Sequence, residues 1–455
     1  MHRHARALPL AALSCALLAC TMVACSGADP RGAAPGSAAV GADPELSAFI
    51  GSIRAVDNHA HANSVTPADS DADALPLDGI PFELPVPLRA DNPAWLAAYQ
   101  AMYNYPHPDL SEPHLGDLRA SMQRMAKTQG DSFPQWVLQQ TGSEVVLANR
   151  IAMGPGLRAP HFRWVSFADA LIFPLSTATE AASSPDRAKL FPLEAKLLQR
   201  YLVDRGVARL PPTLAEYAAT VVTPTLESQQ QGGCVAVKFE AAYLRALDFD
   251  TADSLSASRI YARYVNGGEP TRAEYKTLQD WLFRYVAREA GRLGMAVHIH
   301  SFEGFGNGYR AAGADPLLLE SAFTDPALQG TNFVIVHGGG VYSSHTAAML
   351  WKPNVYADIS MMTLAYTPSR LGAILRMWLT QYPGKILYGS DAVALGPEMG
   401  WEISAWVASR HGREALALAL SDMLRHGEVT RERAHEIAIM VMRTNAGGLY
   451  KLGFQ

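Results

Sequence analysis

Short apolar runs alternate with longer amphipathic stretches along most of this chain. The apolar runs are rich in valine, isoleucine and alanine, and they lie at residues 53–58, 144–149, 163–172, 234–239, 295–300, 332–337, 354–359 and 385–390. Amphipathic, helix-like stretches lie between several of them, at 213–230, 271–293 and 368–382. Apolar strands that alternate with helices are typical of a parallel sheet buried on both faces.

The number of strands narrows the architecture further. Eight such strands predict an α/β protein of the closed (β/α)₈ type, a TIM barrel. A doubly wound open sheet is the alternative. It is disfavoured because no glycine-rich phosphate fingerprint follows the first strand.

The spacing of the runs also predicts the domain organisation. The folded domain is expected to span 46–455, beginning with a short helical turn before the first strand. Residues 62–143 show no clear strand but carry several aromatic residues and prolines. A stretch of this length is too long for a plain loop, so we expect a partly helical insertion after strand 1.

The first 25 residues resemble a bacterial lipoprotein signal peptide. A positively charged start is followed by an apolar run from Ala7 to Cys25. Residues 17–20 and 22–25 both match the cleavage box in which the cysteine becomes the lipid-bearing first residue. Cys25 is favoured because a Gly/Ala/Pro/Ser-rich stretch follows it, whereas Cys20 has the better leucine three positions before it. An uncleaved membrane anchor is the alternative, although the run is short for a membrane span.

Residues 26–45 show no hydrophobic period and are dominated by Gly, Ala, Pro and Ser, which predicts a flexible linker. Together, the two N-terminal segments predict a lipoprotein of the bacterial cell envelope, periplasmic or facing the outer membrane. Its partner there would be the membrane itself, through the lipid on the cysteine.

Composition and charge exclude other partner classes. The 455 residues are 49% hydrophobic and 18% charged, with a net charge of −5, which is ordinary for a globular protein with a large core. No basic stripe suggests nucleic acid, so a small molecule is the expected ligand. Cys234 is the one cysteine in the folded part, which excludes an intrachain disulfide there. Its place at the start of a strand predicts a core residue rather than a nucleophile.

Residues that can bind metals recur at the strand ends. In barrels of this kind the chemistry lies at the C-terminal ends of the strands. Such residues end the first, fourth, fifth, sixth and eighth predicted strands, as His59 and His61, Lys238, His298 and His300, His337, and Asp391. Because side chains alternate along a strand, His59 and His61 are expected to point to the same side. Two neutral imidazoles on one side form half of a metal site.

The pattern resembles the metal-dependent amidohydrolase superfamily, and within it the second amidohydrolase branch. The residues that carry the resemblance are Asp57-Asn58-His59-Ala60-His61, Val237-Lys238-Phe239-Glu240-Ala241-Ala242-Tyr243-Leu244-Arg245, His300, His337-Gly338-Gly339-Gly340, Gly389-Ser390-Asp391 and Asn445-Ala446-Gly447-Gly448-Leu449-Tyr450. The block around Lys238 is also similar to the amidohydrolase-like domain that some organisms fuse to glutamine-synthetase-type modules. The resemblance covers nearly all of 50–455, with the insertion matching weakly.

The residue types assign roles within such a site. His59 and His61 would bind a first divalent metal, and Asp391 would add a carboxylate oxygen. A zinc-like ion in an open site lowers the pKa of its water towards about 7. Asp391 would then take a proton from the attacking water and pass it to the leaving group. His300 and His337 would either complete a second metal site or polarise the carbonyl of the substrate.

Lys238 and the histidine pair of the fifth strand leave alternatives open. In binuclear members of the superfamily a lysine at this position is carboxylated and bridges two metals, and the resemblance implies that role for Lys238. The alternative is a plain cation that pairs with Glu240 or contacts substrate. His298 and His300 share one side of their strand by parity, and His300 is favoured as the ligand because it lies nearer the rim. His298 is then a packed histidine that supports the site.

Several loop residues are candidates for other roles. Arg245, Glu303 and His345 are predicted to contact substrate. Gly338–Gly340 would let the backbone approach a ligand or a neighbouring strand closely, or simply form a tight turn. Arg163 and Trp164 are expected to serve the structure.

The predicted function is a metal-dependent hydrolase. It would use metal-activated water to cleave an amide, ester or lactone-type bond of a small molecule, with one or two ions of zinc, or of manganese in its place. A decarboxylase or isomerase on the same barrel is the nearest alternative, and a non-catalytic surface binding lipoprotein is the third. Association into a homo-oligomer would fit a barrel of this kind.

Overall fold

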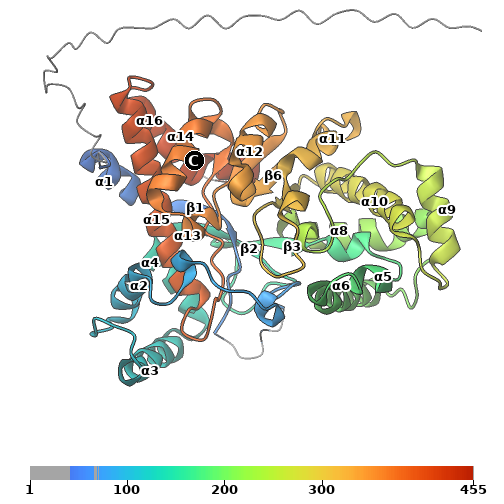
Figure 1. Ribbon diagram of the computed structural model, residues 1–455, viewed down its shortest axis with the longest axis horizontal. Helices are drawn as coiled ribbons and strands as arrows, with labels where there is room; N and C mark the ends of the chain where they lie inside the picture. The colour runs from blue at the N-terminus through green and yellow to red at the C-terminus, as the bar shows by residue number, and fades with distance from the viewer. Residues whose placement is uncertain (1–40, 66–68, 70, 454–455) are drawn as a thin grey trace, which may run out of the picture. The chain divides into compact units, whose positions relative to one another are not determined.

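The computed structural model places eight parallel strands in one sheet whose order follows the chain from β1 to β8, with helices around them (Figure 1). The strands are β1 Ala55–Ala60, β2 Ser143–Asn149, β3 Phe162–Phe167, β4 Cys234–Phe239, β5 Ala296–His300, β6 Phe333–Val336, β7 Val355–Asp358 and β8 Ile386–Leu387. A parallel bridge between Ala60 and Ala392 joins β1 to the segment after β8. The predicted (β/α)₈ barrel is confirmed.

The structure describes residues 41–65, 69 and 71–453. The predicted signal peptide, with Cys20 and Cys25, and nearly all of the predicted linker lie outside the described residues. Within the described part, no helix is both long and apolar enough to cross a membrane.

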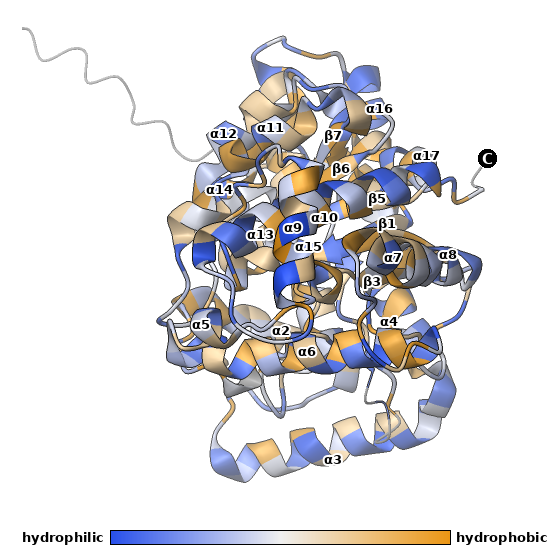
Figure 2. Cartoon of the chain, turned by 90° about the vertical axis from the view of Figure 1, so that its right-hand side faces the viewer, coloured by the Kyte–Doolittle hydropathy of each residue, from blue (hydrophilic) through white to orange (hydrophobic). Residues whose placement is uncertain are grey.

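Helices fill the connections between the strands. They are α1 Pro44–Ser52, α2 Pro93–Tyr103, α3 Glu112–Gln129, α4 Phe133–Thr141, α5 Ala178–Ala181, α6 Pro185–Asp204, α7 Leu214–Tyr217, α8 Thr223–Gln231, α9 Ser254–Tyr264, α10 Arg272–Arg292, α11 Glu320–Phe323, α12 Ser343–Met349, α13 Met362–Ala365, α14 Pro368–Leu379, α15 Trp401–Arg425, α16 Arg431–Ile439 and α17 Asn445–Leu449. The segment 62–143 holds α2, α3 and α4 and is therefore partly helical. Figure 2 shows α3 at the margin of the view with hydrophilic and hydrophobic positions interleaved, and Leu118 is its one buried residue.

Three predicted boundaries were wrong by a few residues. The run 163–172 ends as a strand at Phe167, because β4 ends at Phe239 and leaves nothing further to pair with. Residues 169–172 form a 3₁₀ turn instead. Residues 44 and 45, assigned to the linker, form the first turn of α1, because the Asp43 carboxylate caps this helix by accepting from the Leu46 N–H at 3.0 Å. The run 385–390 pairs as a strand over only two residues.

The interior of the barrel is filled by small and branched apolar side chains. They are Val56, Val145, Leu147, Val165, Ala236, Ala296, Val334, Val336 and Leu387. The end of the chain packs against the same cluster through Ala446, Tyr450 and Leu452. The Tyr450 hydroxyl donates to Asn58 Oδ1 at 2.5 Å and lies 2.7 Å from His298 Nε2. The closing segment thus forms part of the barrel core, and it contacts His298 there.

Removing this hydroxyl should destabilise the barrel. In Tyr450→Phe, Asn58 and His298 each lose a buried partner, and an unsatisfied buried polar group costs about 1–3 kcal/mol. Urea denaturation should therefore show a loss of about that size. Tyr382→Phe is the matched control, because the hydroxyl of this half-buried ring has no hydrogen bond to the described residues. Equal stability of the two variants would contradict this account of the core.

Cys234 and Trp164 have structural surroundings. Cys234 begins β4 and is buried, with Sγ 3.4 Å from Ser166 Oγ, and burial raises the pKa of its thiol. Trp164 donates its indole N–H to the backbone oxygen of Arg150 at 2.8 Å. These placements match the core and structural roles that the sequence predicted.

Candidate metal centre

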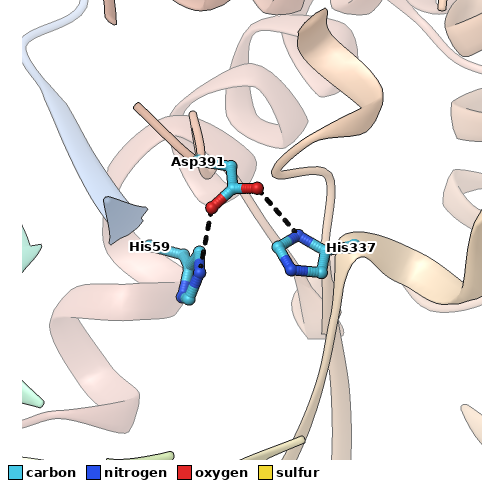
Figure 3. A group of neighbouring side chains, drawn as sticks. All are labelled: His59, His337 and Asp391. Atoms are coloured by element: carbon cyan, nitrogen blue, oxygen red, sulfur yellow. Dashed lines mark ion pairs between the residues drawn. The ribbon is translucent and has the colours of Figure 1, made fainter. Parts of the chain in front are cut away.

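Histidines from two strand ends converge on one carboxylate. Figure 3 shows Asp391 between His59 and His337. Asp391 Oδ1 lies 3.1 Å from His59 Nε2, and Oδ2 lies 3.7 Å from His337 Nδ1. His61 Nε2 lies 3.6 Å from the same Oδ1, so His59 and His61 point to one side as predicted. The ligand atoms of His59, His337 and Asp391 all lie within 4.8 Å of one another, which is compact enough to hold one metal ion.

Buried hydrogen bonds tie the strands that carry these ligands. The Ser390 hydroxyl and backbone N–H donate to the Asp57 carboxylate at 2.5 and 2.9 Å, which joins β1 to the segment that presents Asp391. Asp358, at the end of β7, accepts from the His337 backbone N–H at 2.8 Å and from the Ser360 hydroxyl at 2.5 Å. The ligands are therefore positioned by a network that spans β1, β7 and the segments after β6 and β8.

The backbone is strained at the same residues. His337 and Asp391 have φ values of 66° and 55°, in the left-handed region that side-chain-bearing residues rarely adopt. Met361, which lines the adjoining cavity, has φ 56°. Such conformations cost roughly 1–3 kcal/mol each and cluster at functional sites. After His337, Gly338–Gly340 all have positive φ, and a Cβ on Gly338 would meet Trp378 at 2.5 Å, so the glycines serve a tight turn and close packing.

His59 and His337 are held in their neutral form. Burial holds the pKa of His59 and of His337 well below the usual value, and neighbouring positive charges, including that of Lys238, lower both further. Neutral imidazole is the form that binds metals. His337 Nδ1 lies 2.9 Å from the Ser360 hydroxyl, and His59 Nδ1 lies 2.9 Å from the Asn149 side-chain amide. These contacts orient both rings.

The insertion contributes a carboxylate that sequence reasoning missed. Asp73 Oδ2 lies 3.3 Å from His61 Nδ1. Although burial opposes protonation, the charge of Asp73 and that of Asp391 raise the pKa of His61 above its usual value. Asp73 thus orients His61 in the way that carboxylates orient metal-binding histidines. The sequence indicates only that Asp73 lies in the segment after strand 1. The residues between His61 and Asp73 follow no spacing that would predict their contact.

Lys238 lies beside both the ligands and a group of buried acids. Its Nζ is 3.3 Å from His59 Nε2 and 3.4 Å from Glu240 Oε1. Asp169, after β3, accepts from the Glu240 backbone N–H at 2.7 Å, and burial raises its pKa to about 8. Burial, together with the charges of Asp169 and Glu240, raises the pKa of Glu194 well above its usual value. Asp169 and Glu194 were not predicted from the sequence. The position of Asp169, an aspartate within the apolar run 163–172, was a signal that could have identified it.

His300 faces the cavity in front of the cluster. Its ring centroid lies 4.7 Å from that of His337 and 4.8 Å from that of Tyr243. Its Nε2 is buried and has no hydrogen-bond partner among the described residues. Burial holds its pKa well below the usual value, so the ring is neutral. A buried nitrogen without a partner at this position suits a ligand, either a metal ion or substrate.

A cavity of about 720 Å³ opens over the cluster. Its polar lining residues are His61, Asn63, Asp73, Glu240, Tyr243, His300, His337 and Asp391. Its wall is otherwise apolar, with leucines, Ile80, Phe82, Phe302, Phe305 and Met361. The segment 72–84 of the insertion supplies much of that wall. No arginine or lysine of the described residues lines this cavity.

The three predicted substrate contacts lie elsewhere. Arg245 pairs with Asp280 at 2.8 Å and lines a different cavity. Glu303 accepts from the Tyr366 hydroxyl at 2.5 Å, and His345 Nδ1 lies 2.9 Å from Asp315. None of the three lines the cavity over the cluster. Each of the three side chains pairs with a group within the protein: Arg245 and His345 with an aspartate, and Glu303 with a tyrosine hydroxyl. The sequence did not reveal these pairs.

The donor set fits a divalent metal. Neutral imidazoles and a carboxylate are the ligands that zinc and related ions prefer. His59, His61, His337 and Asp391 supply such donors at one point. The ring of His300 lies next to them, and its Nε2 has no hydrogen-bond partner in the part of the chain that the structure describes. Metal binding is thus supported by the geometry of the residues present.

Comparison of the sequence with known proteins finds a partial match. No family model matches the chain. Protein fluG of Emericella nidulans is 26% identical over 233 residues, which are 49% of this chain and 26% of the fungal protein. The chain thus matches about a quarter of that relative's length.

Solved structures match over most of the chain. A protein of Lactobacillus casei described as a metal-dependent hydrolase is 16% identical with a TM-score of 0.58, covering 89% of this chain and 97% of its own. Glucuronate isomerase of Caulobacter crescentus is 14% identical with a TM-score of 0.59, covering 90% and 94%. Uronate isomerase of Thermotoga maritima is 12% identical with a TM-score of 0.55, covering 90% and 98%.

At these identities the likeness concerns the fold. The eight parallel strands and the cluster of His59, His337 and Asp391 agree with the fold and the kind of site that the sequence predicted. The chain shares its barrel fold with these proteins.

Proposed function

We propose that this protein is a metal-dependent hydrolase that cleaves an amide, ester or lactone-type bond of a small molecule. One observation carries the proposal: His59, His61, His337 and Asp391 converge at the base of a largely apolar cavity at the C-terminal ends of the strands. This is the place where barrel enzymes carry out chemistry. Strained φ angles at two of these residues support a functional rather than a structural role.

His59, His61, His337 and Asp391 would hold the ion, with zinc as the best match to their donor atoms and manganese as the second. A bound divalent ion would supply Lewis-acid activation of water and of the substrate carbonyl. Asp391 is the proton acceptor in this proposal. Burial raises the pKa of its carboxyl, and the charge of a bound divalent ion would lower it. His300 is neutral, and its Nε2 has no hydrogen-bond partner among the described residues, so this atom would contact the carbonyl side of the scissile bond.

Lys238 determines the number of ions. It lies between the first ligands and Glu240, and its charge acts on His300 as well as on His59. As an ammonium it neutralises part of the buried acid group, and the site holds one ion. If Lys238 is carboxylated, it bridges two ions and the buried acids remain beside it. Metal analysis of the purified protein separates these states, because they differ by one ion per chain.

The cavity favours hydrolysis over the alternatives on the same barrel. A carboxylate-bearing substrate, which a decarboxylase or uronate-type isomerase requires, would face Asp73, Glu240 and Asp391. Apart from the proposed metal ion, its carboxylate would find no cation to pair with, because no arginine or lysine is among the described lining residues. An uncharged substrate with an apolar or aromatic body meets no such penalty, and the leucine- and phenylalanine-rich wall would bury it.

The proposal is tested with the metal-loaded protein and two substrate sets. One set holds neutral aromatic esters, amides and lactones; the other holds aromatic carboxylates and uronates. Mass spectrometry of the products should show addition of water to members of the first set, abolished by chelation. Carbon dioxide release or isomerisation in the second set, without hydrolysis in the first, would refute it. Inactivity towards both sets would favour a non-catalytic binding protein.

We also propose that the protein is exported and lipid-anchored through Cys25, with Cys20 as the competing site. The proposal rests on the apolar run and the two cleavage boxes. In a bacterial host, labelled palmitate should enter the full chain, and Cys25→Ala should remove the label while Cys20→Ala keeps it. The reverse pattern would assign Cys20, and unlabelled wild-type protein would refute the anchor.

A further inference from the structure

A second cavity, of about 840 Å³, lies on the same face of the barrel. Its walls come from segments that follow β3, β4 and β5, together with the first turns of α6 and α10. These segments lie at the C-terminal ends of the strands, as the metal ligands do. The two cavities share no lining residue, although Tyr243 lines one and its chain neighbours Ala242 and Leu244 line the other.

The charge of the second cavity is opposite to that of the first. Its basic lining residues are Arg187, Arg245, Arg272, Lys276 and Arg310, and its acidic ones are Glu180 and Asp248. The cavity over the metal-binding residues carries three carboxylates and no described lysine or arginine. The two cavities are therefore suited to ligands of different charge.

Two of the basic residues are neutralised within the protein. Arg245 lies 2.8 Å from Asp280, and Lys276 lies 2.7 Å from the same carboxylate. Lys276 also pairs with Asp250 at 2.8 Å. The charges of Arg245 and Lys276 are therefore balanced by carboxylates of the protein, and neither residue requires a bound ligand.

The remaining three guanidinium groups are in excess. Arg187 and Arg272 share a single carboxylate, that of Glu180, at 3.8 and 3.3 Å. Arg310 forms no ion pair with any described carboxylate, and Arg187 Nε is buried without a hydrogen-bond partner among the described residues. Burial lowers the pKa of Arg187, and the charges of Arg272 and Arg310 lower it further, so the three groups act on one another.

We propose that this cavity binds an oxyanion, the phosphate or carboxylate group of a small molecule, through Arg187, Arg272 and Arg310. Two of these guanidinium groups share one carboxylate and the third pairs with none of the described carboxylates, so a bound anion would offset their excess charge. The planar fork of arginine matches phosphate and carboxylate oxygens. Arg187 and Arg272 also lie in the first turns of α6 and α10, where the helix dipole favours negative charge. The site is independent of the proposed hydrolase activity.

The test is calorimetric titration of the full, metal-loaded protein with inorganic phosphate, and in a second arm with succinate, at constant ionic strength. Arg272→Ala/Arg310→Ala should weaken the binding of the preferred anion at least about tenfold. Both side chains are exposed enough for the variant to fold, which its melting temperature verifies. Arg259→Ala/Arg288→Ala removes the same charge from two exposed arginines outside the cavity and should leave binding unchanged.

A chelated sample separates this site from the metal centre, because phosphate also binds divalent ions. The heat should persist after chelation and remain sensitive to Arg272→Ala/Arg310→Ala. The arm that gives the tighter binding identifies the anion as phosphate or carboxylate. Absence of binding in both arms, or equal binding by the two double variants, would overturn the proposal.

Discussion

Replacing Asp391 by alanine is expected to lower kcat by about 10³-fold or more. Proton transfer by a positioned side chain contributes 10²–10⁴-fold to typical reactions, and Asp391 also contacts both His59 and His337. Most of the metal should remain bound, because His59, His61 and His337 are unchanged. The measurement is kcat on the best neutral ester or lactone, together with metal content of the same preparation.

Two further variants make this result interpretable. Asp391→Asn keeps the shape of the side chain and removes its basicity, so it should lose activity to a similar extent. His345→Ala should change kcat less than about twofold, because His345 pairs with Asp315 away from the cavity. If Asp391→Ala retained more than a tenth of wild-type activity, Asp391 would not be the proton acceptor.

Removal of the metal should also destabilise the fold. A ligand that binds only the folded state stabilises it by about 4 kcal/mol when its free concentration is a thousand times its Kd. The cluster of buried histidines, Asp391 and Lys238 brings strands β1, β4, β6 and β8 together, so the ion joins distant parts of the chain. Urea unfolding with and without a chelator should differ by about that amount under these conditions.

The control for metal removal is His59→Ala/His61→Ala. Its unfolding curve should not respond to the chelator, because two of the first ligands are gone. Identical curves for wild-type protein with and without chelator would show that no ion contributes to the folded state. A chelator effect of equal size in the double variant would place the stabilising ion elsewhere.

The barrel could be predicted because its strands are buried on both faces and are therefore apolar throughout. All eight runs form strands. The errors fall where a strand ends without a change in hydrophobicity. The run 163–172 stays apolar past Phe167, and only the end of β4 stops the pairing. The run 385–390 continues as the segment that presents Asp391, whose positive φ no sequence pattern displays.

The convergence of histidines and Asp391 could be predicted because the fold places strand ends at one rim. His59, His61, His337 and Asp391 follow from that rule alone. Asp73 and Glu194 were not predicted, because each comes from an element whose position relative to the rim depends on tertiary packing. Asn149, which ends β2, and Asp169, which follows β3, lie at strand ends and were missed although the same rule covers them. Arg245 and His345 were predicted to contact substrate, yet they pair with Asp280 and Asp315, which lie 35 and 30 residues away in the sequence.

The most direct test of the account is the metal content of the purified full chain, measured by elemental analysis beside that of His59→Ala/His61→Ala. The account predicts one or two divalent ions per wild-type chain, with zinc as the main element, and almost none in the double variant. One ion would assign Lys238 as a cation, and two would assign it as a carboxylated bridge. Wild-type protein that hydrolyses substrate without any divalent ion would contradict the central claim.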